Sequence, residues 1–353
     1  MMRRAASQVV TYHPDLTHPR WLGALGHVSK LTYSYSCPGG ADQMSCVLQV
    51  PPTYRTDAMD PGRVVRIYRG GSCVWDGKLN EPTPDVPGWT ITAHGAGTFG
   101  SDFVAYYTTW NLNDAVNQAI TRGLRWTNPG IGGGWLSQQV DSGSQTVTDH
   151  LNMITVQSAQ VWQVDRNNAL QVTAIPNVVN RLLVSTDPVP RTIANDITTV
   201  WLKYTASDDG QGNTTYGLTD SFDQADINMH GPTEVYADLS NAGVMSSGAA
   251  QTVGNNFLAR YQRAAFAGPY TVRYGQLLTT GGTPIDLGTE RAGTVCRLLV
   301  TDAPFGGEVP TGVIEFTVGA YSYDDDAQVA QITPMQSARS DFSSLLSLIS
   351  PTS

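Results

Sequence analysis

Gly95, Gly97 and Gly100 form the pattern in this chain that is most often associated with chemistry. The segment GAGTFG matches GxGxxG, which in dinucleotide-binding proteins lets a pyrophosphate approach the backbone at a helix N-terminus. That site needs a helix opening at the third glycine, but aromatic, β-prone residues follow at 103–110. The glycine-rich stretch at 130–134 likewise lacks the Lys-Ser/Thr pair of a phosphate loop. The sequence therefore predicts a glycine bend that closes a sheet, and no cofactor.

The six histidines are spaced neither for a metal site nor for a catalytic triad. They form no HxH or HxxxH pair. Asp149 and His150 are adjacent, but consecutive residues on a helix point about 100° apart, and no GxSxG segment supplies a nucleophile. We expect His150 on a helix surface or in an interface. No catalytic residue and no metal ligand is predicted, so the chain is not expected to be an enzyme.

Two acidic runs are interpreted as surface turns. Asp324-Asp325-Asp326 is expected to be a solvated turn that blunts a strand edge. The run from Asp208 to Asn213 offers oxygen ligands but lacks the twelfth-position glutamate of a calcium loop, so a polar hairpin tip is expected. Two carboxylates that cleave a glycosidic bond can be distant in a chain, so glycan cleavage stays open as an alternative.

The four cysteines show no metal or redox spacing. Cys37, Cys46, Cys73 and Cys296 contain no CxxC pair, and Cys73 and Cys296 fall at apolar strand positions, where small buried side chains are expected. Cys37 and Cys46 flank a Pro-Gly-Gly turn and could face each other across a hairpin. A disulfide between them stays open.

Composition favours a mainly β protein of several domains. Only 14% of the 353 residues are charged, against about 25% in an average soluble protein, and 35 glycines and 20 prolines suit short strands joined by turns. A chain of this length usually divides into two or three domains. The net charge of −9 argues against binding to nucleic-acid phosphates, but it would suit the wall of a tube through which DNA passes.

Alternating apolar residues predict strands in the first hundred residues. Three antiparallel strands are expected at 63–97, and the first two are joined by Gly70-Gly71, whose positive φ suits a tight hairpin. An earlier strand pair is expected at 28–36 and 46–50. The N-terminal residues 1–21 are expected to be an extended arm outside the core, without a signal peptide. No window approaches 18 apolar residues, so no membrane segment is expected.

Helical spacing begins after Asn111. One helix is expected from there to Gly123, and another from about Val147, started by Ser144 or Thr148, with a hairpin following at 161–174. The later part of the chain is expected to hold one long helix, at 246–267, and strands at 199–204, 214–218, 233–237, 270–274, 294–300, 313–323 and 328–334. These strands are enough for a second small barrel.

Three segments together resemble the baseplate or tail-tip hub proteins of long-tailed bacteriophages. They are R-V-V-R-I-Y-R-G-G…V-W-D-G-K-L…G-W-T-I-T-A-H-G at 63–95, T-V-T-D-H-L…V-W-Q-V-D-R-N-N-A-L-Q-V at 146–172 and G-V-I-E-F-T-V…Y-S-Y-D-D-D…A-Q-I-T-P at 312–334. The resemblance implies two small antiparallel β-barrel domains with an α+β insertion. The expected division is an arm at 1–21, a first barrel at 22–108, a helix-hairpin insertion at 109–181, a second barrel with a long helix at 182–336 and a tail at 337–353.

The resemblance also implies a structural role as a minor tail protein. Hubs of this kind are homotrimers that join the sixfold tail tube and distal tail protein ring to threefold tip or fibre proteins. The tape-measure protein is a further expected partner, and DNA passes through the lumen without specific binding. The expected location is the virion, at the tail tip or baseplate, after synthesis in the host cytoplasm. A sixfold distal tail ring protein and a carbohydrate-binding or glycan-cleaving β protein of the tail remain alternatives.

Apolar residues near the C-terminus are the main candidates for contact with other chains. Phe342, Leu345, Leu346 and Ile349 lie on one side of a possible short helix, whose apolar face needs a partner. That partner could be the chain's own domain, a neighbouring subunit or a central tip protein. Trp135, in a glycine-rich loop, is the other candidate, and for it the core and an interface are both open.

Overall fold

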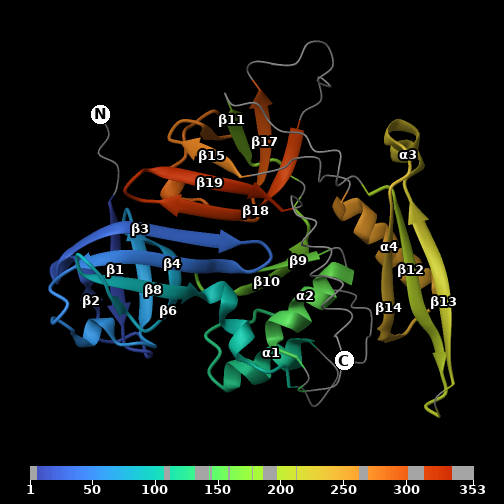
Figure 1. The fold of residues 1–353 in the computed structure, drawn as a ribbon, viewed down its shortest axis with the longest axis horizontal. Helices are drawn as coiled ribbons and strands as arrows, with labels where there is room; N and C mark the ends of the chain where they lie inside the picture. Colours follow the sequence, from blue (N-terminus) through green and yellow to red (C-terminus); the bar gives the residue numbers. More distant parts are fainter. Residues whose placement is uncertain are drawn as a thin grey trace.

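The computed structural model describes residues 6–106, 112–131, 143, 145–157, 160–176, 178–185, 197–211, 213–261, 269–300 and 314–335. The strands form one large sheet, a two-stranded hairpin and a three-stranded sheet (Figure 1). The predicted fold class, mainly β with an α+β insertion, is confirmed.

The first eight strands of the described chain lie in the large sheet. They are β1 (Ser7–Tyr12), β2 (Arg20–Trp21), β3 (His27–Ser36), β4 (Gly40–Gln49), β5 (Val64–Arg69), β6 (Ser72–Leu79), β7 (Thr83–Pro84) and β8 (Trp89–Gly95). The predicted glycine hairpin joins β5 to β6, with φ of 56° at Gly70 and 82° at Gly71. Strand β8 pairs with β6 on one side and with β4 on the other, so the predicted meander is confirmed.

The N-terminal segment belongs to this sheet. Strand β1 pairs with β5 over its whole length, from Ser7 opposite Arg69 to Tyr12 opposite Val64. Its alternate side chains Val9 and Thr11 are buried. The prediction of an arm outside the core is therefore corrected for residues 7–12. A short strand such as β1 is held in the sheet by its hydrogen bonds to β5, and local composition does not reveal that pairing.

Six strands from the second half of the chain continue the same sheet. They are β11 (Arg181–Ser185), β15 (Tyr270–Arg273), β16 (Leu277–Thr279), β17 (Val295–Val300), β18 (Ile314–Asp324) and β19 (Val329–Pro334). Strand β18 pairs antiparallel with β3, from Ala320 opposite Ser36 to Asp324 opposite Thr32. The strands predicted for the first barrel are thus joined in one curled sheet with those predicted at 270–274, 294–300, 313–323 and 328–334. The sheet passes from one half of the chain to the other at β3 and β18 (Figure 1).

One core serves both halves of the sheet. Buried side chains of β3, β4, β5, β6 and β8 contact those of β17, β18 and β19 in a single apolar cluster. Cys37, Cys46 and Cys296 belong to it, and none of the four cysteines, all of which the structure describes, is in a disulfide. Burial raises the pKa of Cys46 and Cys296 to about 12, so these thiols behave as small apolar side chains. The disulfide that the sequence left open is not formed.

Residues 96–174 contain two helices and a hairpin, the elements that were predicted for the α+β insertion at 109–181. The described elements of this segment are the 3-10 helix η3 (Ala96–Asp102), helices α1 (Leu112–Thr121) and α2 (Val147–Gln157), and the hairpin of β9 (Gln160–Val164) and β10 (Leu170–Ala174). They enclose a second apolar core. Helix α2 is capped by Thr146: its Oγ1 accepts from the Asp149 amide at 3.2 Å, and the Asp149 carboxylate accepts from the Thr146 amide at 3.1 Å. This reciprocal cap corrects the predicted start at Ser144 or Thr148.

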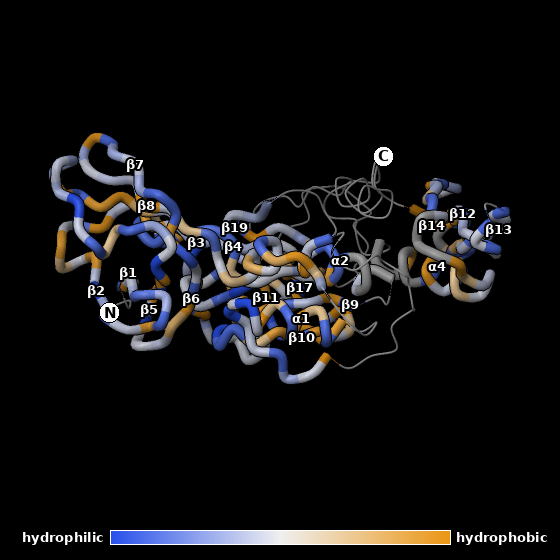
Figure 2. Tube along the Cα trace, turned by 90° about the horizontal axis from the view of Figure 1, so that it is seen from below, coloured by the Kyte–Doolittle hydropathy of each residue, from blue (hydrophilic) through white to orange (hydrophobic). Residues whose placement is uncertain are grey.

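Residues 199–261 build a third unit, which lies at the far end of the molecule from β1 and β2 (Figure 2). It contains β12 (Thr199–Asp208), β13 (Thr214–Phe222), α3 (Gln224–His230), β14 (Glu234–Val244) and α4 (Ser247–Tyr261). Strand β12 lies between β13 and β14, and α4 packs on β12 and β13 over a separate apolar core. The range predicted for the second barrel thus includes strands of the large sheet and this separate unit. Where the domains divide stays a prediction.

Within the described residues, no helix has both the length and the apolar character needed to span a bilayer.

Two leucines on adjacent strands of the third unit test which face of its sheet is buried. We expect Leu202→Ala to cost about 2–5 kcal/mol, because truncating a buried leucine removes contacts and leaves a cavity. Leu218→Ala removes a side chain that is 59% exposed, whereas Leu202 is 1% exposed, and it should cost under about 0.5 kcal/mol. Hydrogen exchange of the β12 amides measures both losses. Equal losses would contradict the assignment of the two faces.

Candidate functional site

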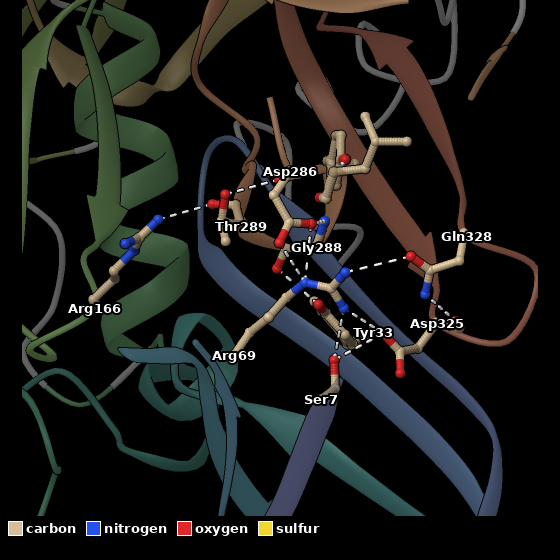
Figure 3. A network of polar contacts seen from close by, with 11 residues as sticks. Ser7, Tyr33, Arg69, Arg166, Asp286, Gly288, Thr289, Asp325 and Gln328 are labelled. Carbon is tan, nitrogen blue, oxygen red and sulfur yellow. Dashed lines mark hydrogen bonds and ion pairs between the residues drawn. The ribbon is translucent and has the colours of Figure 1, made fainter. Parts of the chain in front are cut away.

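A buried arginine joins the two halves of the large sheet. Arg69 ends β5, directly before the glycine hairpin, and its side chain is 1% exposed. Its Nε donates to both carboxylate oxygens of Asp286, at 2.9 and 2.7 Å. Its Nη1 donates to Asp325 Oδ1 at 2.5 Å and to Ser7 Oγ at 3.0 Å. Figure 3 shows these side chains converging on the guanidinium.

The groups around Arg69 come from segments that are distant in the sequence. Ser7 begins β1, and Asp325 lies in the turn between β18 and β19. Asp286 precedes the 3-10 helix η5 (Leu287–Thr289) and also accepts from the Gly288 amide at 3.1 Å. The planar guanidinium can donate in several directions at once, so one side chain holds all three segments. We call Arg69, Ser7, Asp286 and Asp325 the arginine junction.

The electrostatics of the arginine junction keep its cation charged. Burial alone lowers the pKa of Arg69, but the hydrogen bond that it donates to Asp286 and the nearby negative charges raise it above the usual value. The guanidinium also lies over the ring of Tyr323, with its central carbon 5.2 Å from the ring centroid. A buried charge with carboxylates on two sides is compensated, and removing it would leave those carboxylates without their cation.

Four buried tyrosines form a layer beside the arginine junction. Tyr33 and Tyr35 of β3 stand opposite Tyr323 and Tyr321 of β18 in cross-strand pairs. The hydroxyls of Tyr33 and Tyr321 donate to backbone carbonyls of η5 at 2.7 and 2.6 Å. Burial raises the pKa of all four, that of Tyr323 to about 12, so they remain protonated donors at neutral pH. The layer and the arginine junction together fix η5 against the β3–β18 seam.

The arrangement can position chain segments, and we find in it no group poised to react. The tyrosine hydroxyls are held in the protonated form, and the guanidinium is compensated by carboxylates. Across the part of the chain that the structure describes, no cluster of three or more His, Cys, Asp or Glu side chains could hold a metal ion. What the contacts of the arginine junction and the tyrosine layer do is hold chain segments together.

The interaction residues predicted from the sequence lie outside the described residues. They are Trp135, Phe342, Leu345, Leu346 and Ile349. Their role stays a prediction.

His150 lies inside the molecule and not on a helix surface. It is 5% exposed, because α2 packs against α1, η3 and β9. Burial lowers the pKa of its imidazole. Its neighbour Asp149 is engaged in the cap of α2. The prediction of a surface or interface histidine is therefore corrected. The sequence pattern of the helix is local, and it could not show that α1, η3 and β9 pack against α2.

The GxGxxG glycines permit close packing of η3 on β4. A Cβ at Gly95 would lie 2.3 Å from the carbonyl of Ala41, and one at Gly97 would lie 2.7 Å from the same carbonyl oxygen. At Gly100 it would lie 2.6 Å from the Trp126 ring. A 3-10 helix follows the first glycine, in place of the α-helix that a dinucleotide site requires. The chain does bend at these glycines, and that the bend closes the sheet stays a prediction.

The acidic run at 324–326 does form the predicted turn, but it is more than a solvated one. Asp325 is a half-buried partner of Arg69, with its side chain 16% exposed, and Asp326 accepts from the Lys30 amide at 2.6 Å. Sequence reasoning missed the arginine junction, because nothing local links Arg69 to Asp325. The polar hairpin tip at 208–213 is confirmed for its described residues, where Asp209 accepts from the Gln211 and Asn213 amides.

An exposed aromatic surface lies on the face of the third unit that α4 does not cover. We call it the aromatic face and define it by Trp201, Tyr216, Leu218, Phe222 and Tyr236. The four residues on the outer strands are each more than half exposed. Lys203 crosses this surface, pairs with Asp238 at 3.0 Å and lies 4.5 Å from the Tyr216 ring centroid. Grouped exposed apolar side chains are typical of contact surfaces.

The described fold is that of phage tail proteins. No protein-family model and no curated protein sequence matches the chain. Solved structures do match it along almost its whole length, at low sequence identity, and the resemblance predicted from the sequence is confirmed at the level of the fold.

Three of these structures define the match. The 43 kDa tail protein of prophage MuSo2 from Shewanella oneidensis has a TM-score of 0.62 and 16% identity, and the match covers 94% of this chain and 99% of that one. A tail protein from Neisseria meningitidis also has a TM-score of 0.62, with 12% identity and coverage of 94% and 96%. A prophage tail protein from Listeria monocytogenes has a TM-score of 0.58, with 10% identity and coverage of 97% and 98%.

Removing the cation from the arginine junction should destabilise the large sheet. We expect Arg69→Met to cost about 2–3 kcal/mol, below the ~3–5 kcal/mol of a fully buried pair because the Asp286 side chain is 39% exposed. Arg297→Met is the control: Arg297 pairs with Glu315 at 2.8 Å, but both are exposed, at 41% and 37%, so its loss should stay below about 1 kcal/mol. Hydrogen exchange of the β5 and β18 amides gives both values. The junction loses its assigned role if the two variants behave alike.

The glycine bend should not accept a methyl group. We expect Gly95→Ala to cost about 1–3 kcal/mol, because its Cβ would meet the Ala41 backbone and the two strands would have to separate. Gly248→Ala is the control, since nothing lies within 4 Å of a Cβ there, and in the first turn of α4 alanine should be neutral or stabilising by up to about 1 kcal/mol. Thermal denaturation compares the two. Unchanged stability of Gly95→Ala would refute the packing explanation.

Proposed function

We propose that this chain is a structural hub of a phage tail tip. Three copies form a ring that joins the sixfold tail tube and distal tail ring to threefold tip or fibre proteins. The tape-measure protein is a further partner, and DNA leaves through the lumen without specific binding. The hub is located in the virion, at the tail tip or baseplate, and it performs no bond-breaking step.

The fold match along nearly the whole chain is the observation that carries the proposal. The match covers 94% or more of this chain and 96% or more of each tail protein, so the likeness extends over the whole fold and is not confined to a single barrel. At these identities fold likeness does not transfer a function by itself, so the specific role as a hub rests on the family resemblance of the sequence motifs.

The connection between the two halves supports a ring-forming role. A subunit that converts one symmetry to another has to present its faces at fixed angles. Here the β3–β18 ladder, the tyrosine layer and the arginine junction hold the two halves of the large sheet together. The net charge of −9 further supports a lumen through which DNA slides without adhering.

The mass of the assembled protein tests the proposal. We expect purified full-length chain, measured by mass photometry over a range of concentrations, to populate a species of three copies. A stable species of six would favour the distal tail ring instead. A chain that stays monomeric and binds glycans on an array would support the carbohydrate-binding alternative and would contradict the hub.

A further inference from the structure

A polar cavity lies where three parts of the chain meet. Its volume is about 260 Å³, and it is bounded by β3 and the start of β4, by the β9–β10 hairpin and by the loop at 289–294. Its wall holds three arginines, Arg166, Arg181 and Arg291, against two carboxylates, Asp165 and Glu290. The cavity wall is therefore positively charged, although the chain as a whole is acidic.

Both carboxylates of the wall are engaged by other groups. Glu290 is 4% exposed and accepts from Arg181 Nε at 2.6 Å. The Asp165 carboxylate accepts from the Asn167 and Ala169 amides, at 2.7 and 2.9 Å, and thereby shapes the hairpin turn. These contacts leave the charges of Arg166 and Arg291 without a carboxylate in ion-pair contact among the residues described here.

Arg291 is held by weak partners for a cation in this position. Its Nη2 donates to the Val74 carbonyl at 3.3 Å, and its central carbon lies 5.3 Å from the Tyr35 ring centroid. Its Nε is buried without a hydrogen-bond partner. Burial lowers the pKa of Arg291, and the nearby charge of Arg166 lowers it further, while Tyr35 and Asp165 act in the opposite direction. A buried N–H without a hydrogen-bond acceptor destabilises the fold, and on a cation an anion is the most favourable acceptor.

Arg166 adds a second donor, from the β9–β10 hairpin. It is exposed at the tip of the β9–β10 hairpin, and its Nη2 donates to the Thr289 carbonyl at 2.8 Å (Figure 3). Both arginines line the cavity, and the charge of Arg166 lies near enough to Arg291 to lower its pKa. Forked guanidinium donors match the paired oxygens of a carboxylate or a phosphate.

We propose that this cavity binds a carboxylate group, which accepts hydrogen bonds from Arg291 and Arg166. The wall has one more cation than it has carboxylates, so a monoanion neutralises it, whereas a phosphate dianion would leave a surplus negative charge in the cavity. The carboxylate can be that of a small acid or of an acidic side chain on a partner protein. Its binding would fasten the β9–β10 hairpin to the loop at 289–294.

Titration of the full-length chain with sodium acetate tests the proposal. Saturation-transfer NMR of the acetate methyl group gives the affinity, with sodium chloride added to hold the ionic strength constant. We expect Arg291→Met to weaken acetate binding at least tenfold and Arg297→Met, the exposed control, to leave it unchanged. No saturable acetate binding by the unmodified chain, or equal binding by Arg291→Met, would overturn the proposal.

Further probes identify the anion and guard against a variant that fails to fold. Arg166→Gln changes an exposed residue, so it should keep the melting temperature and still weaken acetate binding at least threefold; unchanged binding would count against the site. Inorganic phosphate should compete more weakly than acetate, and tighter phosphate binding would refute the carboxylate assignment. Tighter binding of N-acetylglutamate α-amide than of acetate would support a protein side chain as the source, and the reverse order a small acid.

Discussion

A positive charge buried inside a sheet has to be neutralised by groups that the surrounding strands supply. Arg69 meets this constraint with Asp286 and Asp325, which reach it from segments of the other half of the chain. Replacing such a cluster by apolar residues is often neutral, so its value lies less in net stability than in fixing one arrangement. Any sliding of β5 relative to η5 or the β18–β19 turn would leave a charge uncompensated, and this makes the register of the two halves specific.

The same constraint bears on the assembly role proposed for this chain. The tyrosine layer satisfies the carbonyls of η5 while filling the core, and the arginine junction fixes the rim beside it. The third unit contrasts with this rigid centre, because its sheet has a core on one face and the exposed aromatic face on the other. A tightly connected centre with an uncovered surface at the far end would suit the proposed hub, which has to hold its contact faces at fixed angles.

Local patterns predicted most elements, and long-range contacts account for what they missed. Alternation and glycine turns located β5, β6 and β8, and helical spacing located α1, α2 and α4, because each depends on neighbours in the sequence. Strand β1 and the buried His150 depend on elements that pack against them from elsewhere. Asp325 looked like a solvated turn residue because its partner Arg69 lies in a strand near the other end of the chain. The predicted contact residues from Phe342 to Ile349 fall outside the described part.

The pairing of β3 with β18 has a consequence for the order in which the molecule can form. Translation delivers β3 early and β18 only after most of the polypeptide has left the ribosome. Until then the outer edge of β3 presents unpaired amides and carbonyls, a template that other nascent chains could join. Pairing of β18 with β3 brings together residues that are far apart in the sequence. The entropic cost of closing so large a loop slows this folding step. The topology therefore requires that the outer edge of β3 be protected from other chains while the protein is being synthesised.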